Sequence, residues 1–345
     1  MNKTLLANVA LLFASLLVVF VILEVAVRFT QAGQDYVPSD CCSFVLRPST
    51  SFCYSTKEFS NCFKTNNEGY LSGPFECPAG KQIIAVLGDS FTEAKQVAQD
   101  KSYTALLQTM GDWCVYNYGI SAYGTGHELQ TYRAKVVPQN PNIVVLQFQP
   151  QNDITDNLRV TDYINGTLQL KHDNQFKPRN PYALQLPSFI RSRVGLLLAR
   201  MGFLNQSGFE KAPLDNYMVY TLPQGKWVDA WDREEILLGM FKNETASRGE
   251  RLIILIATAP EQVNPAYRKA LFDVYPGLAN TSFVFHEPNQ QMLRICDKLG
   301  IECIDMLGFN RSDTHFFYDG HWNEKGHQLA ATVLAQRIEQ GPVSQ

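Results

Sequence analysis

Polar residues that could perform nucleophilic catalysis follow strand-like segments of this 345-residue chain. The tripeptide Gly-Asp-Ser at 88–90 ends one apolar run, and Asp-Gly-His at 319–321 precedes the last helix-like segment. A serine hydroxyl becomes a nucleophile when a histidine takes its proton and a carboxylate orients that histidine. The sequence therefore predicts a catalytic triad of Ser90, His321 and Asp319.

The same segments supply donors for an oxyanion, the negatively charged oxygen that forms in acyl transfer. We predict three donors: the N–H of Ser90, a backbone N–H near Ala122, and the side-chain amide of Asn152. Each such donor typically lowers the activation barrier by about 3 kcal/mol. The residue set therefore indicates acyl-transfer chemistry through an acyl-Ser90 intermediate.

Neighbouring residues are expected to support the site without reacting. Asp89 is expected to hold the nucleophile turn by hydrogen bonds, and Asp153 to do the same for Asn152. Gly88 is expected to permit the sharp turn before Ser90. Three aromatic residues fit the pocket lining and the core equally well, and both interpretations remain open: Phe91, Tyr123 and Trp322.

A metal site is the competing interpretation of the histidines near the last motif. His327 could pair with Asp319 on a metal ion, but no further ligands follow at a suitable spacing. We therefore expect no metal and no other cofactor. His315 is interpreted as a loop residue or a residue at the rim of the substrate site, and not as the base.

These motifs resemble the four blocks of the SGNH (GDSL-type) hydrolase family, and they occur in the same chain order. The matching stretches are 88–91, 117–124, 151–153 and 319–321. The resemblance covers about 65–157 and 250–340, and it is closest to bacterial membrane-anchored members, which have a similar Asn-Glu-Gly-Tyr at 67–70. It implies a flavodoxin-like fold, a Ser/His/Asp triad, no metal, and ester or acyl-transfer chemistry.

The last block, Asp-Gly-His-Trp at 319–322, is also similar to that of alginate O-acetyltransferase-like proteins. Two positions depart from the family pattern, because Ala122 and Pro150 stand where glycines are usual. The Ala122 N–H survives the change, so the donor can remain. The departures leave the substrate class open.

Alternating strand-like and helix-like segments predict a doubly wound α/β fold with a central parallel sheet, and the family resemblance implies its flavodoxin-like three-layer α/β/α form. Strands are expected at 83–87, 115–118, 143–148, 252–257 and 301–306, and helices at 93–110, 126–136, 229–247, 288–299 and 323–340. Asp229 and Asn323 are candidate helix caps. The chain divides into a transmembrane anchor (1–30), a Cys-rich irregular lead-in (31–80) and a hydrolase domain (81–345) with an insertion at about 158–228 that contains one amphipathic helix near 188–200.

The N-terminal segment is apolar enough to cross a membrane. Residues 5–23 carry no charge, and a helix of that length spans roughly 28 Å. We expect residues 5–27 to anchor the protein, with a cleaved signal peptide as the alternative. Lys3 before the span favours an extracytoplasmic catalytic domain, which is periplasmic in a Gram-negative cell. The net charge of −3, with scattered Lys and Arg, gives no reason to expect a nucleic-acid partner.

Eight cysteines fit an exported protein, because disulfides persist in oxidising compartments. Five of them lie between 41 and 77, so disulfides are expected there, although their pairing cannot be deduced. Cys114 and Cys303 lie in apolar strand-like runs, where a small buried side chain is at least as good an interpretation as a disulfide.

Three functions remain open at this point. The first is a membrane-anchored esterase or deacetylase that acts on an acylated glycan, a lipid or a small ester. The second is an O-acyltransferase that modifies an extracytoplasmic polysaccharide with the same triad. The third is a non-catalytic glycan-binding assembly protein on a hydrolase scaffold, which the changes at Ala122 and Pro150 favour.

Overall fold

A computed structural model describes residues 3–29, 36–173 and 214–341, together with positions 184, 186–187, 189–191 and 194. The predicted amphipathic helix near 188–200 falls mostly outside the described residues.

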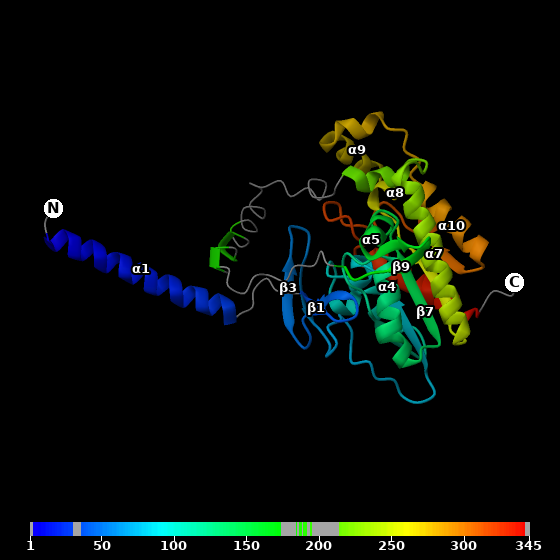
Figure 1. Ribbon diagram of the computed structural model, residues 1–345, viewed down its shortest axis with the longest axis horizontal. Helices are drawn as coiled ribbons and strands as arrows, with labels where there is room; N and C mark the ends of the chain where they lie inside the picture. The colour runs from blue at the N-terminus through cyan, green and yellow to red at the C-terminus, as the bar shows by residue number, and fades with distance from the viewer. Residues whose placement is uncertain are drawn as a thin grey trace.

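The central sheet has five parallel strands and confirms the predicted fold class (Figure 1). Its strands are β5 (Gln82–Leu87), β6 (Trp113–Asn117), β7 (Ile143–Phe148), β10 (Arg251–Ile256) and β11 (Glu302–Asp305). They lie in the order β11-β10-β7-β5-β6, which is the flavodoxin-like order 2-1-3-4-5 when the strands are numbered along the chain. In such a sheet, ligands bind beyond the carboxyl ends of the strands, where the order reverses between β5 and β7.

Helices cover both faces of this sheet. One face packs against α4 (Thr125–Thr131), α7 (Lys226–Ser247) and α10 (Glu287–Leu299), and the other against α3 (Tyr103–Gln108) and α11 (Glu324–Glu339). Each face of the sheet forms its own hydrophobic core with the helices that cover it. Alternate side chains of β5 are buried in these two cores, Ala85 and Leu87 in one and Ile84 and Val86 in the other. The strands β5, β7 and β10 are mostly apolar because both of their faces are buried.

The predicted helix at 93–110 is wrong, because two short helices replace it. They are α2 (Ser90–Glu93) and α3 (Tyr103–Gln108), separated by η1 (Gln99–Lys101). Ala94 has a left-handed backbone with a φ of 60° and ends α2. The Ser102 side chain then accepts a hydrogen bond from the Ala105 N–H at 3.2 Å and starts α3.

The other predicted helices are present with shifted ends. Helix α7 begins after Gly225 and not at Asp229, which instead pairs with Arg233 at 2.9 Å inside the helix. Asn323 caps α11 as expected, accepting from the N–H groups of Lys325 and Gly326. Helix α4 continues into the π-turn η2 (Tyr132–Val136). The remaining short helices are η3 (Val137–Gln139), α5 (Asp153–Val160), η5 (Leu214–Tyr220), α8 (Pro260–Val263), α9 (Pro265–Val274), η6 (Pro276–Asn280) and η7 (Met306–Gly308).

The lead-in is more ordered than the sequence suggested, because it contains two antiparallel hairpins. They pair β1 (Tyr36–Ser39) with β2 (Ser43–Leu46), and β3 (Ser51–Ser55) with β4 (Ser60–Lys64). A third hairpin, β8 (Thr161–Ile164) with β9 (Thr167–Leu170), lies in the segment interpreted as an insertion. These strands lack the long apolar runs of the central sheet, which explains why they were missed.

All eight cysteines form disulfides, which join Cys41 to Cys42, Cys53 to Cys62, Cys77 to Cys114, and Cys296 to Cys303. The interpretation of Cys114 and Cys303 as isolated buried side chains is therefore wrong. Cys53 and Cys62 are direct cross-strand partners in the β3–β4 hairpin, so this disulfide closes the hairpin on itself.

The N-terminal helix α1 (Lys3–Phe29) contains the predicted apolar span. Its segment Ala7–Val27 has a mean hydropathy of 2.8, and most of its large apolar side chains are exposed. This length and composition are those of a membrane anchor or a signal sequence.

Candidate active site

Ser90, His321 and Asp319 form a continuous hydrogen-bonded relay. The Ser90 Oγ lies 2.7 Å from the His321 Nε2, and the His321 Nδ1 lies 2.6 Å from the Asp319 Oδ1. Ser90 begins α2 directly after β5, whereas the other two residues lie on the loop before α11. The structure thus brings together residues that lie 231 positions apart in the chain.

The turn before Ser90 requires glycine for steric reasons. A Cβ atom at Gly88 would lie 2.1 Å from the Thr92 Oγ1 and 2.6 Å from the Gln147 Oε1. Thr92 cannot move aside freely, because its hydroxyl also lies 2.7 Å from the Tyr103 hydroxyl. The glycine therefore lets the nucleophile turn approach the neighbouring strand closely.

Asp89 holds the nucleophile turn, as predicted. Its buried carboxylate accepts from the Phe91 N–H at 2.8 Å and from the Asn152 Nδ2 at 3.0 Å. Burial raises the pKa of Asp89, and these two hydrogen bonds and the nearby His321 partly offset the effect. Asp89 thereby connects the serine turn to the candidate oxyanion donor Asn152.

Gln147 supports the same turn and was missed in the sequence. Its buried Oε1 accepts from the Asp89 N–H at 3.2 Å and from the Thr92 hydroxyl at 2.8 Å. The available signal was the single polar residue in the otherwise apolar strand Ile143–Phe148. A buried amide in such a strand needs hydrogen-bond partners.

Asn152 and Asp153 lie where the loop after β7 enters α5. Asn152 is the N-cap position of α5 and lines the same pocket as Ser90. Asp153 accepts from the Gln149 N–H at 2.7 Å, so it stabilises the turn that carries Asn152 and does not contact the Asn152 side chain directly. Burial raises the pKa of Asp153 well above its ordinary value, with the charge of Asp89 as a further cause.

The charge on His321 depends on its carboxylate partner. Burial lowers the pKa of His321, but Asp319, together with the charge of Asp89, outweighs burial and raises it overall. The short contact to Asp319 assigns the proton to Nδ1, which leaves Nε2 as the acceptor for the Ser90 hydroxyl proton.

The loop that carries His321 is a tight turn. The Phe316 N–H donates to the His321 carbonyl at 2.9 Å, and Gly320 has a φ of 87°. His315 is buried below this loop and its Nε2 contacts the Thr258 carbonyl at 2.9 Å. Burial also lowers the pKa of His315 to about 4. Because its side chain is buried and is not among the residues that line the pocket, the interpretation as a residue at the substrate rim is wrong.

A pocket of about 210 Å³ opens beside the relay. It is lined by Ser90, Phe91, Gln149, Gln151, Asn152, Tyr217, Pro260, Glu261, Tyr267, Asp319, Gly320 and His321. Burial raises the pKa of Glu261 to about 7, although it accepts hydrogen bonds from Gln151 and Tyr220 at 2.8 and 2.9 Å. The lining is rich in groups that can hydrogen-bond, so it suits a small polar ligand.

The structure places one of the three aromatic residues at the pocket and the other two in the core. Phe91 lines the pocket and packs 4.8 Å from the His321 ring, measured between centroids. Trp322 and Tyr123 are fully buried and belong to the two cores. His327 is also a core residue: it accepts from the Tyr103 N–H at 3.3 Å, and burial lowers its pKa to about 3.

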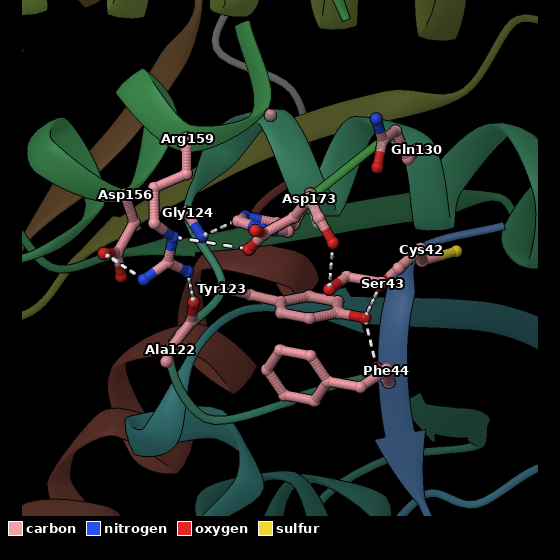
Figure 2. Close-up of polar contacts among 12 residues, drawn as sticks. Cys42, Ser43, Phe44, Ala122, Tyr123, Gly124, Gln130, Asp156, Arg159 and Asp173 are labelled. Atoms are coloured by element: carbon pink, nitrogen blue, oxygen red, sulfur yellow. Dashed lines mark hydrogen bonds and ion pairs between the residues drawn. The ribbon is translucent and has the colours of Figure 1, made fainter. Parts of the chain in front are cut away.

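Ala122 lies in the loop after β6 and is not among the residues that line the pocket. Figure 2 shows its carbonyl facing the guanidinium of Arg159. Its φ of 65° is left-handed, which explains why glycine suits this position. Its carbonyl accepts from the Arg159 Nη2 at 2.6 Å, and Arg159 also pairs with Asp156 at 3.0 Å and Asp173 at 3.4 Å. The structure therefore fixes the Ala122 peptide through Arg159, and its role as a donor stays a prediction.

Within the described residues, no group of three or more His, Cys, Asp or Glu side chains is arranged to hold a metal ion. The carboxyl groups behind the pocket, including Glu128 and Asp153, are buried, and burial raises the pKa values of both well above their ordinary range.

The chain is similar to known proteins in structure but matches none of them in sequence. No family model and no curated protein sequence matches the chain. Similar solved structures include an esterase from Pseudoalteromonas sp. (13% identity, 75% of this chain and 98% of the other, TM-score 0.40). They also include a carbohydrate acetylesterase from Sinorhizobium meliloti (11%, 75% and 99%, TM-score 0.40) and a GDSL-like lipase from Bacteroides thetaiotaomicron (11%, 77% and 92%, TM-score 0.41). The chain is thus similar in structure to two esterases and a GDSL-like lipase, and the argument for its own function rests on the geometry of its site.

Proposed function

We propose that this protein is a serine hydrolase that cleaves carboxylic esters through an acyl-Ser90 intermediate. The observation that carries the proposal is the relay from the Ser90 Oγ to the His321 Nε2 at 2.7 Å and from the His321 Nδ1 to the Asp319 Oδ1 at 2.6 Å. Both distances lie within hydrogen-bond reach, which a nucleophile and its base require.

In the first half-reaction, the His321 Nε2 takes the Ser90 hydroxyl proton while the Oγ attacks the ester carbonyl carbon. The tetrahedral intermediate then collapses, and the imidazolium gives its proton to the departing alcohol oxygen. In the second half-reaction, the His321 Nε2 takes a proton from water while the water oxygen attacks the acyl carbon. The bond from that carbon to the Ser90 Oγ then breaks, the imidazolium returns its proton to the Oγ, and the carboxylic acid leaves. Asp319 keeps the imidazole in the required tautomer and stabilises its charged form.

Asn152 and the Ser90 N–H are the proposed donors to the oxyanion. A side-chain amide has two N–H donors, and Asp89 accepts one of those of Asn152. Asn152 lines the same pocket as Ser90, so its amide is the proposed donor to an oxyanion that forms there. Asp89 would thus orient Asn152 before the substrate binds, which is the condition for effective electrostatic stabilisation.

The direct test is hydrolysis of p-nitrophenyl acetate by the full chain in detergent. We expect Ser90→Ala to lower kcat by about 10⁴-fold or more, because the residual rate comes only from binding and the oxyanion donors. Circular dichroism and thermal unfolding of the variant should match the wild type. Hydrolysis that is unchanged in Ser90→Ala would reject the proposal.

The second candidate is an O-acyltransferase, in which a sugar hydroxyl captures the acyl group in place of water. It is supported by the polar pocket lining, including Gln149, Gln151 and Tyr217, and by the resemblance of the Asp-Gly-His-Trp block. A labelled acyl donor with an oligosaccharide acceptor separates the two functions. Formation of free acid alone, at every acceptor concentration, would exclude transfer.

A non-catalytic glycan-binding protein is the third possibility, and it predicts that a fluorophosphonate does not label Ser90. Labelling of Ser90 would exclude it.

We further propose that the catalytic domain is extracytoplasmic and anchored through residues 5–27. The apolar helix α1 and the four disulfides support this location, because disulfides persist in oxidising compartments. Fractionation of cells followed by protease treatment of spheroplasts tests it. Protection of the domain from protease in intact spheroplasts would contradict it.

A further inference from the structure

The β3–β4 hairpin of the lead-in reaches the loop that carries the base and its carboxylate. Glu58, in the four-residue connection between these strands, accepts three consecutive backbone N–H groups of that loop. Its Oε1 lies 2.8 Å from the Phe317 N, and its Oε2 lies 3.0 Å from the Tyr318 N and 2.8 Å from the Asp319 N. One half-buried carboxylate thus binds the peptide groups that lead directly into Asp319.

Successive backbone N–H groups that converge on one point form a concave site for an anion. In this protein the anion is supplied by another part of the chain, 261 residues away from Asp319. Charge-assisted hydrogen bonds of this kind are about twice as strong as neutral ones. The loop also has two internal backbone bonds, Phe316–His321 and Gly320–Phe316, at 2.9 and 3.2 Å, and Asn323 closes its base by donating to the Thr314 and His315 carbonyls at 3.0 and 3.2 Å. None of these bonds reaches the N–H groups of Phe317, Tyr318 and Asp319, which Glu58 binds. Glu58 is therefore a major constraint on its conformation.

The hairpin is rigid enough to act as this support. The Thr56 hydroxyl accepts from the Glu58 N–H at 3.1 Å and fixes the connection. The Cys53–Cys62 disulfide joins the two strands. Asn61 donates to the Gln96 carbonyl at 2.8 Å, which ties the hairpin to the segment after the nucleophile helix.

Aromatic contacts join the hairpin to the same loop. The Phe59 and Phe316 rings lie 5.1 Å apart, and the Lys57 ammonium lies 2.9 Å from the centre of the Tyr318 ring. Lys57 and Phe59, which make these contacts, lie on either side of Glu58 in sequence. The connection between β3 and β4 therefore packs against the loop on both sides of the Glu58 hydrogen bonds. Glu58 is not among the residues that line the pocket, so it does not contact the substrate there.

We propose that Glu58 is a positioning residue that fixes the Asp319–His321 loop, so that the lead-in hairpin is an integral part of the active site. This inference rests on the proposed function and assigns that site a component outside the segments that carry its motifs. Removal of the carboxylate would let the loop relax and lengthen the contact between Asp319 and the His321 Nδ1. Because Asp319 raises the pKa of His321 against the effect of burial, a longer contact would lower that pKa.

The test compares Glu58→Ala and Glu58→Gln with Glu68→Gln, all in the full chain in detergent. Glu68 is a matched control, since it is also a lead-in glutamate, and it pairs with Lys135 at 3.5 Å. We expect kcat for p-nitrophenyl acetate to fall about 10²-fold in Glu58→Ala and about tenfold in Glu58→Gln, with KM unchanged. The acid limb of the pH–rate profile should move to lower pH, because the base titrates there.

A second measurement does not depend on activity. NMR of histidine-labelled protein follows the His321 ring, assigned with a His321→Gln variant. We expect a lower His321 pKa and loss of the downfield Nδ1 proton signal in Glu58→Ala, with wild-type values in Glu68→Gln.

An unchanged His321 pKa and Nδ1 signal in both Glu58 variants would overturn the proposal, whatever the activity. A wild-type protein without esterase activity would reject the proposed function, and a lower His321 pKa in Glu58→Ala would still support the positioning role. A Glu58→Ala variant that fails to fold leaves Glu58→Gln as the deciding variant, because the amide keeps the shape of the side chain.

Discussion

Ser90 lies on a turn that packs against the neighbouring central strand β7, whereas His321 and Asp319 lie on a loop supported by a hairpin from another part of the chain. On the serine side, Gly88 and Asp89 pack closely against Gln147 of the neighbouring strand. An added Cβ at Gly88 would lie 2.6 Å from the Gln147 Oε1. On the histidine side, the corresponding loop depends on hydrogen bonds, including those from its N–H groups to Glu58 of the lead-in hairpin.

This difference indicates that the two halves of the relay should fail in different ways. The serine turn is fixed by close packing, so a substitution there should cost folding stability. The histidine loop is fixed by directional hydrogen bonds near the surface. A substitution there should disturb the geometry of the relay and lower kcat, with little change in the free energy of unfolding. The following predictions test this contrast, beginning with the largest expected effect.

Asp319→Asn should lower kcat/KM for p-nitrophenyl acetate by about 10⁴-fold, because an amide no longer secures the correct tautomer of His321. Thermal unfolding should change little, since Asp319 lies in the surface loop. Asp313→Asn is the control, because Asp313 pairs with Lys325 at 2.7 Å on the surface. Retention of more than a tenth of the wild-type rate by Asp319→Asn would argue against the relay.

Asn152→Ala should lower kcat by about 10²- to 10³-fold, as expected for loss of one oxyanion donor. The KM should stay close to the wild-type value, because the donor acts mainly on the transition state. Asn243→Ala, at an exposed position on α7, serves as the control and should leave kcat unchanged. A higher KM with an unchanged kcat would instead assign Asn152 to ground-state binding.

Gly88→Ala should destabilise the fold by about 3 kcal/mol, because the added methyl would meet Thr92 and Gln147 in a packed turn. Gly320→Ala should cost only about 1 kcal/mol, since its strain comes from a φ of 87° and the nearest atom to a new Cβ is 3.4 Å away. Urea unfolding in detergent measures both values. Equal losses in the free energy of unfolding for the two variants would contradict the contrast between the packed turn at Gly88 and the open turn at Gly320.

Cys53→Ser with Cys62→Ser should lower stability by about 2 kcal/mol and kcat by about threefold, because the hairpin that carries Glu58 loosens. Cys296→Ser with Cys303→Ser is the matched control: it also opens a short loop, with a separation of 7 residues against 9. The control should lose similar stability without a loss in kcat. An equal fall in kcat in both pairs would show that general destabilisation is the cause.

The sequence predicted the central sheet well because buried parallel strands give long apolar runs between breakers. Five such runs became β5, β6, β7, β10 and β11. The helix expected at 93–110 failed, since neither the left-handed turn at Ala94 nor the cap at Ser102 interrupts the apolar pattern. Side-chain capping and backbone φ are local features that hydrophobic periodicity does not record.

The candidate site divides in the same way. Ser90, His321, Asp319 and Asn152 could be selected because each follows a strand or precedes a helix, and strand ends meet at one edge of a parallel sheet. Glu58 could not be selected, because nothing near it in sequence resembles a site. Its role depends on where the β3–β4 hairpin packs.

The sequence by itself determined the layer architecture, the apolar N-terminal span and the residue types available for catalysis, because these follow from local pattern and composition. Only the tertiary structure decided the disulfide pairing, the partners of Ala122 and Asp153, and the support of the Asp319 loop by Glu58. The Ala122–Arg159 and Glu58–Asp319 contacts join residues 37 and 261 positions apart, whereas the Gln149–Asp153 contact and the Cys53–Cys62 disulfide join residues only 4 and 9 positions apart. All of them depend on packing and hydrogen-bond geometry, which a linear pattern does not contain.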